Sequence, residues 1–398
     1  MRPCIQAEEI REVVDSLRSG WLTTGPKVRR FERDFASFVG AKHAIAVNSA
    51  TAALHLSIVA LGVRRGQAVL LPTMTFAATA EVLYYEGVIP ILVDCDPVTG
   101  NIDINDAEEK LARYRRGELP VTGDGDVVGI IPVHVGGLMA DMRAVNDFAE
   151  RHGLWIVEDA AHSLPAAWRE TDDAEWIRCG QNTSSVTCYS FYANKTITTG
   201  EGGMAVTASE ELAEKMRLFS LHGLSRDAWD RYSGGGSWDY QILEPGFKYN
   251  MTDVAAALGI HQLARAESMR LEREAIAEYY LEQFKDVEEI SLPPIGENRI
   301  HSWHLFPIRL NLEKMSIDRN TFVEKLRENG VGFSVHWRPL HLHPYYAERQ
   351  GWKPEDLPQA TEMWPRLVSL PIFQSMTAGE SRKVVETVKS VVSGAVGQ

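Results

Sequence analysis

The sequence is poor in cysteine and has no excess of basic residues. Its 398 residues include four cysteines with neither a C-x-x-C motif nor paired spacing, so neither a zinc site nor a disulfide framework is predicted. Lys and Arg number 41 against 54 Asp and Glu, which gives a formal net charge of −13. Non-specific binding of nucleic acid or of an anionic membrane requires an excess of positive charge, so these partners are excluded, whereas a local basic pocket for a small anion is not.

Long hydrophobic runs are also lacking. The segment 43–63 contains no Asp, Glu, Lys or Arg, but its histidine, asparagine, serine and threonine residues make it too polar for a transmembrane helix. We expect a buried strand followed by a helix there. The N-terminal segment carries acidic residues where a signal peptide would have its apolar core, so we expect a protein of the reducing cytoplasm.

The motifs of the common nucleotide-binding folds are missing. No G-x-G-x-x-G follows the first predicted strand and no G-x-x-x-x-G-K-[ST] occurs, which argues against nicotinamide and ATP chemistry. His336, His341 and His343 are close in sequence, but no acidic residue lies among them. We therefore expect them in a substrate pocket or in packing, and we expect no metal site.

Apolar, β-branched runs alternate with helical patterns through the first two thirds of the chain. Uniformly apolar strands separated by helices indicate an α/β fold with a mostly parallel sheet covered on both faces. The predicted strands are Ala44–Val47, Ala68–Leu71, Ile89–Asp94, Val127–Val133 and Leu154–Val157, and the predicted helices include Ala50–Leu61 and Met142–Arg151.

The length of the chain predicts more than one hydrophobic core. We expect a large α/β domain over residues 1–262 and, over residues 263–398, a linking helix followed by a smaller α/β domain. In the smaller domain His304–Leu310 and Val331–Trp337 are predicted strands, with a helix at Arg319–Asn329 between them. Arg226–Trp238 is polar and contains three glycines, which is typical of a mobile loop.

The stretch Val186–Gly203 has a pattern that indicates chemistry more than packing. It begins with alternating β-branched and aromatic residues, as in a strand, and a single lysine, Lys195, follows. Gly200, Gly202 and Gly203 then crowd together, where the backbone must turn or another group must come close. A lone lysine after a strand is usually a solvated loop residue, but a desolvated lysine has a lowered pKa and can form a Schiff base.

Three further places offer polar or aromatic groups at the ends of predicted elements, where open α/β sheets bind their ligands. Asn48–Leu54 opens a helix with small residues, which suits a phosphate, although an ordinary capped helix explains this motif better when it is taken alone. Phe76 follows a strand and can stack on a flat ring, or simply pack in the core. Asp159 ends an apolar run beside a second acid, and a buried carboxylate must be paired or functional.

Pyridoxal phosphate requires all of these groups together. Its phosphate suits a helix N-terminus, its ring a stacking partner, its pyridine nitrogen a carboxylate and its aldehyde a lysine. Asp159 precedes Lys195 by 36 residues, about one strand–crossover–strand unit, so both can lie at the same edge of the sheet. Together these groups favour pyridoxal phosphate over the other ligands considered.

Four motifs occur in order along the chain: N-S-A-T-A-A-L at 48–54, E-D-A-A-H at 158–162, S-F-Y-A-N-K-T-I-T-T-G-E-G-G-M at 190–204 and G-F-K-Y-N-M-T-D at 246–253. Together they resemble the pyridoxal-phosphate-dependent nucleotide-sugar aminotransferases of the DegT/StrS group. That group has the aspartate-aminotransferase-like fold, fold type I. The resemblance runs from Ser19 to Phe373 and implies this fold for nearly the whole chain.

The resemblance also implies roles for individual residues. Lys195 would form the internal aldimine, and Asp159 would pair with the pyridine nitrogen. The other implied contacts are those of Ala50, Thr51 and Ser190 with the cofactor phosphate, of Phe76 with the ring face, and of His162 with the ring hydroxyl or face. Asn250 would reach the phosphate from the partner subunit, so a homodimer with shared active sites is expected.

The implied reaction is transamination in ping-pong half-reactions, with L-glutamate as the amino donor. Lysine at position 195 favours it, because relatives with histidine there remove a hydroxyl instead. The motifs look most like those of enzymes that aminate C4 of a nucleotide-linked 4-keto sugar; a C3 sugar aminotransferase, a cyclitol aminotransferase and a pyridoxal-phosphate-binding regulator are the alternatives. Candidate substrate-binding residues are Thr24, Arg226, Arg231, Lys248, His336 and Arg338, of which the basic ones suit a diphosphate.

Overall fold

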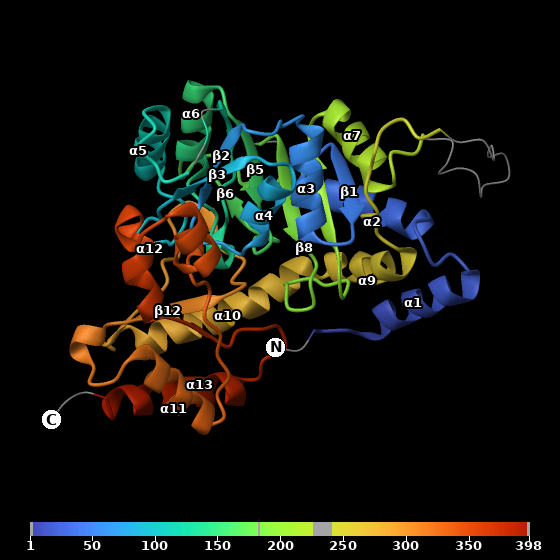
Figure 1. Ribbon diagram of the computed structural model, residues 1–398. Coiled ribbons are helices and arrows are strands. Elements are labelled where there is room, and N and C mark those ends of the chain that lie inside the picture. The colour runs from blue at the N-terminus through green and yellow to red at the C-terminus, as the bar shows by residue number, and fades with distance from the viewer. Residues whose placement is uncertain (1–2, 122, 124, 182–183, 226–240, 396–398) are drawn as a thin grey trace.

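A computed structural model of the chain describes residues 3–121, 123, 125–181, 184–225 and 241–395. Its centre is a seven-stranded sheet with the strand order β1-β9-β8-β5-β4-β2-β3 (Figure 1). The strands are β1 (His43–Val47), β2 (Ala68–Pro72), β3 (Ile89–Val93), β4 (Val127–Ile130), β5 (Trp155–Asp159), β8 (Val186–Ser190) and β9 (Gly203–Thr207). The predicted mobile loop, Arg226–Trp238, lies outside the described residues.

The sheet is mostly parallel, as the sequence predicts. Strands β8, β5, β4, β2 and β3 run parallel to one another, while β9 lies antiparallel between β1 and β8. Every residue of β2 and β9 is buried, so the sheet is covered on both faces. Parallel strands point their carboxyl ends toward one edge, and in such folds that edge carries the ligand.

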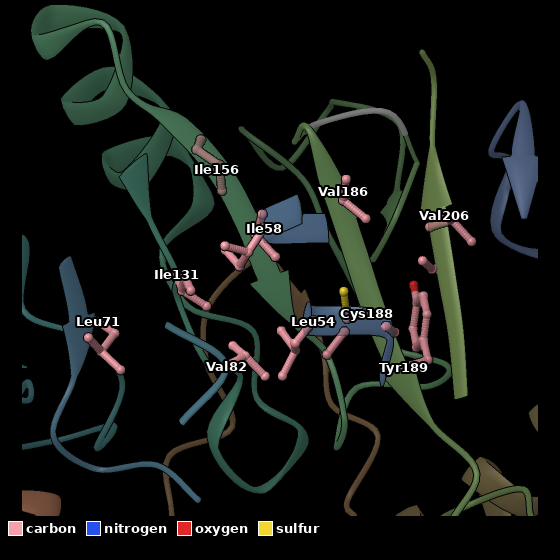
Figure 2. Close-up of a cluster of buried hydrophobic side chains, with 14 of the residues drawn as sticks. Leu54, Ile58, Leu71, Val82, Ile131, Ile156, Val186, Cys188, Tyr189 and Val206 are labelled. Carbon is pink, nitrogen blue, oxygen red and sulfur yellow. The ribbon is translucent and has the colours of Figure 1, made fainter. Parts of the chain in front are cut away.

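Helices connect and cover these strands. They are α1 (Ala7–Ser19), α2 (Pro26–Val39), α3 (Ala50–Ala60), α4 (Ala78–Tyr85), α5 (Ile104–Arg115), α6 (Met142–His152), α7 (Glu210–Ser220) and α9 (Asp253–Ala264). Helix α3 contacts both α4 and α7, and its Leu54 and Ile58 pack toward Cys188 of β8 in the main core (Figure 2). Its position is fixed locally, because the Ser49 hydroxyl accepts a hydrogen bond from the Ala52 N–H at 3.1 Å.

The C-terminal third forms a second hydrophobic core below the main sheet in Figure 1. Helix α10 (Ala266–Phe284) follows α9 directly and packs on α13 (Ala378–Ser393). A small antiparallel sheet of β10 (Ile290–Ser291), β12 (Phe306–Leu310) and β13 (Leu367–Leu370) completes this core with α11 (Arg319–Glu328). The remaining elements are a three-stranded sheet of β6 (Ala167–Trp168), β7 (Ile177–Arg178) and β11 (Arg299–Ile300), and α12 (Pro358–Met363).

Two details of this region differ from or refine the sequence-based picture. The strand predicted at Val331–Trp337 is wrong: only Ser334 makes a bridge, to Ser369, and the end of the segment lies against the cavity described below. The domain boundary expected after residue 262 falls in the last turn of α9 and stays a prediction. Among the described residues, no helix is both long and apolar enough to cross a bilayer.

Candidate active site

A cavity of about 470 Å³ opens at the carboxyl ends of β5 and β8. It brings together most of the residues singled out in the sequence, although they come from distant parts of the chain. Those that line it are Ala50, Thr51, Phe76, Asp159, His162, Ser190, Lys195 and His336. Asp159 is the last residue of β5 and Ser190 the last of β8, so the parallel strands place these side chains at one edge.

One wall of the cavity is the N-terminus of α3. The Ser49 hydroxyl accepts from Ala52, and the Ser49 carbonyl accepts from Ala53 at 3.1 Å, which leaves the N–H groups of Ala50 and Thr51 in the first turn for a ligand. Gly203 lies directly against this turn: a Cβ there would come within 2.5 Å of the Ser49 carbonyl carbon. A glycine is therefore required at position 203 so that β9 can approach this turn. Position 200 favours glycine for another reason, because its φ of +82° lies in the left-handed region.

Asp159 is buried at the base of the cavity. Its Oδ2 accepts a hydrogen bond from the Thr79 hydroxyl at 2.8 Å, and its Oδ1 accepts from the Ala161 N–H at 3.2 Å. Burial raises the pKa of this carboxyl above its usual value, while these two hydrogen bonds and the positive charge of Lys195 act in the opposite direction. Neither donor is charged, so the carboxylate can still pair with a cationic group of a ligand.

Glu158 precedes Asp159 but belongs to a closed network. The Ala140 N–H donates to Nδ1 of His134, so Nε2 of that ring donates to Glu158 at 2.8 Å. Burial acts to raise the pKa of Glu158, but the hydrogen bonds from His134 and from two hydroxyls bring it below its usual value. The possible ligand atoms of His134, Glu158 and Cys179 lie within 4.8 Å of one another. Two ligand atoms of a tetrahedral zinc ion stand only about 3.3 Å apart, so hydrogen bonding explains this cluster better than a zinc site does.

Lys195 extends into the cavity from the loop after β8. Burial lowers the pKa of its amine to about 8, against the opposing field of Asp159. With this pKa about one tenth of the amine is unprotonated at pH 7, far more than for an ordinary lysine, and the unprotonated form is the nucleophile.

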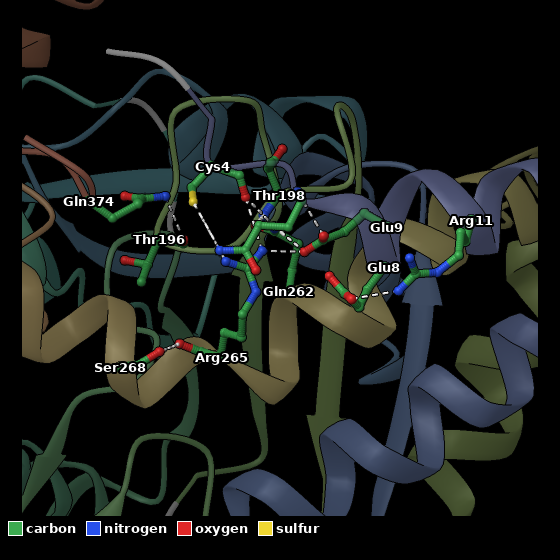
Figure 3. A network of polar contacts seen from close by, with 11 residues as sticks. Cys4, Glu8, Glu9, Arg11, Thr196, Thr198, Gln262, Arg265, Ser268 and Gln374 are labelled. Carbon is green, nitrogen blue, oxygen red and sulfur yellow. Dashed lines mark hydrogen bonds and ion pairs between the residues drawn. The ribbon is translucent and has the colours of Figure 1, made fainter.

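The Lys195 loop is tied to α9 and to the C-terminal region. Gln262 of α9 accepts a hydrogen bond from the Thr198 N–H at 3.3 Å and donates to Glu9 of α1 at 2.8 Å (Figure 3). Gln374 donates to the Thr196 carbonyl at 3.2 Å, next to the lysine. Hydrogen bonds from two separate parts of the chain therefore hold this loop, and Glu9 in turn fixes Gln262, which favours a fixed position for the Lys195 amine.

The opposite wall carries aromatic rings that the sequence did not reveal as a group. The His304 ring centre lies 4.2 Å from that of His162, and the Trp337 ring stacks on His162 with the ring centres 5.0 Å apart. Burial, reinforced by neighbouring charges that include Lys195, lowers the pKa of both histidines well below the usual value. His336 has a pKa of about 4 for the same reasons. These rings are thus neutral, and Nδ1 of His162 and of His304 has no hydrogen-bond partner in the described part of the protein.

The other candidate residues that the structure describes do not line this cavity. Thr24 and Asn250 line a different one of about 700 Å³, where the Asn250 amide donates to the Thr24 hydroxyl at 2.7 Å. The exposed side chains of Lys248 and Arg338 donate to Asn250 and to the Leu342 carbonyl, respectively. Arg226 and Arg231 lie outside the described residues.

The cavity fits pyridoxal phosphate. The open N–H groups of α3 suit a phosphate, the Asp159 carboxylate suits a protonated pyridine nitrogen, and the Lys195 amine suits an aldehyde. Phe76 lies at the rim with 63% of its surface exposed in the single chain, so its ring is free to stack on a ligand. The unpartnered histidine nitrogens add polar groups for a ring substituent or a substrate.

Comparisons with known proteins all point to the same protein family. The family model "DegT/DnrJ/EryC1/StrS aminotransferase family" matches residues 3–389. An uncharacterised protein of Methanocaldococcus jannaschii is 43% identical over 395 residues, covering 98% of this chain and 97% of the relative. The spore coat polysaccharide biosynthesis protein SpsC of Bacillus subtilis is 41% identical over 394 residues, covering 99% and 96%.

Solved structures agree in fold and cofactor. A putative sugar aminotransferase from Streptococcus pneumoniae, in its PLP form, superposes with a TM-score of 0.86 at 30% identity, covering all of this chain and 98% of that one. The same protein is also solved in its PMP form. The fold is therefore that of the fold type I sugar aminotransferases, and the cofactor is pyridoxal phosphate. The chain belongs to the DegT/DnrJ/EryC1/StrS aminotransferase family of pyridoxal-phosphate-dependent sugar aminotransferases.

Proposed function

We propose that the protein transfers the amino group of L-glutamate to C4 of a nucleotide-linked 4-keto sugar, as a homodimer in the cytoplasm. The observation that carries the transamination is the presence of Lys195 and Asp159 in one cavity, with the amine at a pKa of about 8. The choice of C4 rests on the motifs at 158–162 and 246–253 and on the long segment that begins at residue 222. Lys248 and Arg338 are the described basic residues that we assign to the diphosphate.

In this proposal the chain supplies positioning and proton transfer. Bound pyridoxal phosphate supplies the electron sink that stabilises the substrate carbanion when a C–H bond breaks. The Lys195 amine, when unprotonated, removes the proton from the donor carbon and later returns a proton to the sugar carbon. Asp159 would keep the pyridine nitrogen protonated. Its negative charge acts strongly on that nitrogen because the site is buried and excludes water.

The neutral histidines of the cavity supply polar groups for the substrate. His162 and His304 offer ring nitrogens without bringing a second cation close to Lys195. A cationic neighbour would lower the pKa of the lysine further and would compete for Asp159. We propose that these nitrogens bind uncharged hydroxyl groups of the ligand.

A panel of keto substrates tests the assignment. With L-glutamate as donor, we expect kcat/KM for a nucleotide-linked 4-keto sugar to exceed that for a 3-keto sugar, a cyclitol ketone or a free sugar by about 10²-fold or more, because a site that binds hydroxyl groups rejects substrates that misplace them. The product is identified by mass spectrometry and NMR. Product from 3-keto sugars or cyclitols alone would replace the C4 proposal with one of those alternatives.

Two observations support the homodimer. Asn250 and Thr24 line a different cavity from the one that holds Lys195, which supports a role for Asn250 at the cofactor of a second copy. Helix α1 also has an inverted burial pattern: Ile10 and Leu17, on one face, are each 57% exposed, whereas its Glu9 and Ser16 are buried. An exposed apolar face of this kind is typical of a surface covered by a partner, and we propose a second copy as that partner.

Subunit mixing provides a direct test of the shared site. Asn250→Asp would bring a negative charge toward the phosphate, and Lys195→Ala removes the amine, so each homodimer should be nearly inactive. When the two are unfolded together and refolded as a mixture, half of the dimers are mixed, and each contains one intact site if Asn250 acts on the partner. We expect recovery of about a quarter of wild-type activity per subunit pair. No recovery would show that both residues act within one chain.

A further inference from the structure

Two buried hydroxyls lie in series behind Asp159. The Thr75 and Thr79 hydroxyl oxygens are 2.7 Å apart, and the Thr79 hydroxyl donates to Asp159 Oδ2 at 2.8 Å. Thr79 is fully buried and Thr75 is 1% exposed, so water does not replace these contacts. Neither threonine was among the residues singled out in the sequence.

The hydrogen bonds in this series have only one possible direction while Asp159 is ionised. A carboxylate can only accept, so the single hydroxyl proton of Thr79 is committed to Asp159. The oxygen of Thr79 is then free to accept, and the Thr75 hydroxyl must donate to it. Both dipoles thus point their positive ends toward the carboxylate and stabilise its charged form where burial opposes it.

The backbone of Asp159 is fixed independently of these hydroxyls. Its N–H donates to the Pro132 carbonyl at 2.9 Å, and its carbonyl accepts from the His134 N–H at 3.2 Å. Within the described part of the chain, the uncharged hydrogen-bond partners of the carboxylate are the Thr79 hydroxyl and the Ala161 N–H. The side-chain orientation of Asp159 therefore depends on Thr79.

The threonines also connect the carboxylate to the cavity rim. Thr79 lies in the first turn of α4, and Thr75 and Phe76 line the cavity just before this helix. One short turn therefore carries both the rim aromatic and the donor to Asp159. A movement of this turn would change the two contacts together.

We propose that Thr79, supported by Thr75, is a positioning residue for the reaction, which keeps Asp159 ionised and oriented toward the pyridine nitrogen of the cofactor. The inference rests on the pyridoxal-phosphate chemistry of the family and not on the identity of the sugar. Besides these hydroxyls and the Ala161 N–H, the described groups Lys195 and His134 also act electrostatically on Asp159, and both favour its ionised form.

The test uses substitutions that remove one hydroxyl at nearly constant volume. Thr79→Val should weaken binding of pyridoxal phosphate to the apoprotein by about tenfold and lower the rate of the half-reaction with L-glutamate by about 10- to 100-fold, since a hydrogen bond to a charged group is lost. Thr79→Ser should recover both within about threefold. Thr75→Val should change both in the same direction by a smaller factor, because Thr79 still contacts Asp159.

Thr207→Val is the matched control, because Thr207 is also buried and its hydroxyl donates to the Ser185 carbonyl at 2.7 Å, on the far end of β9. It should lower Tm without changing cofactor affinity. The pH profile of cofactor absorption adds a readout that a purely structural role would not move: in Thr79→Val its transition should shift, while in Thr207→Val it should not.

Three results would overturn the proposal: unchanged cofactor affinity and half-reaction rate in Thr79→Val, a Thr79→Ser variant as impaired as the valine variant, or an effect of Thr207→Val on the pH profile as large as that of Thr79→Val. If Thr79→Val does not fold, Thr75→Val carries the same test, and an unchanged cofactor affinity there would be decisive against it. None of these readouts involves the sugar, so failure of the C4 assignment would appear only in the substrate panel.

Discussion

Replacing Lys195 by alanine is expected to lower turnover by about 10⁴-fold or more, while the protein remains folded. Among the described residues that line the cavity, Lys195 carries the amine, and its lowered pKa of about 8 allows it to act as nucleophile and proton carrier. The visible absorption band of the bound cofactor should also be lost or shifted. Steady-state kinetics and an absorption spectrum of the purified variant measure both effects.

A surface lysine provides the control for this substitution. Lys285, just after α10, is exposed and pairs with Glu282 at 2.7 Å, so Lys285→Ala should leave turnover and spectrum unchanged. If Lys195→Ala keeps turnover, the proposed mechanism is wrong. If the wild-type protein binds pyridoxal phosphate but shows no turnover with any keto substrate, the regulator remains as the explanation.

The second large effect is expected from Asp159→Asn, which should reduce turnover by about 10³-fold. The amide has nearly the same volume and can still contact Thr79, but it carries no charge to keep the pyridine nitrogen protonated. The electron sink therefore weakens and the C–H bond breaks more slowly. Single-turnover rates with L-glutamate isolate this step from sugar binding.

A variant of the neighbouring acid, Glu158, distinguishes a chemical role of Asp159 from a structural one. Glu158 is fully buried and accepts hydrogen bonds from His134, Ser184 and Thr187. In Glu158→Gln an amide N–H would face one of these donors, so Tm should fall while the glutamate half-reaction stays within about tenfold of wild type. An equal loss of rate in the two variants would contradict the assignment of the carboxylate role to Asp159 alone.

Local sequence signals were sufficient for the main elements of the fold. Ser49 caps α3 as its position predicts, and the strand pattern at 186–190 is β8. The glycine cluster also had local reasons, although they differ between its members: Gly200 has a positive φ, whereas Gly203 allows a close approach. Where a local signal was ambiguous, as in Val331–Trp337, the segment formed a single bridge to β13 because its end packs at the cavity.

The sequence by itself determined the fold class and the cofactor, and it predicted that Lys195 and Asp159 lie at one edge of the sheet, because caps, strand periodicity and strand-end residues are encoded over short spans. Only the tertiary structure decided what surrounds that pair. The Thr79 donor lies 80 residues from Asp159, and His304 reaches His162 from the second core, so no local pattern connects them. The structure also separated Asn250 and Thr24 from the Lys195 cavity, because such long-range distances depend on how the packed elements meet in space.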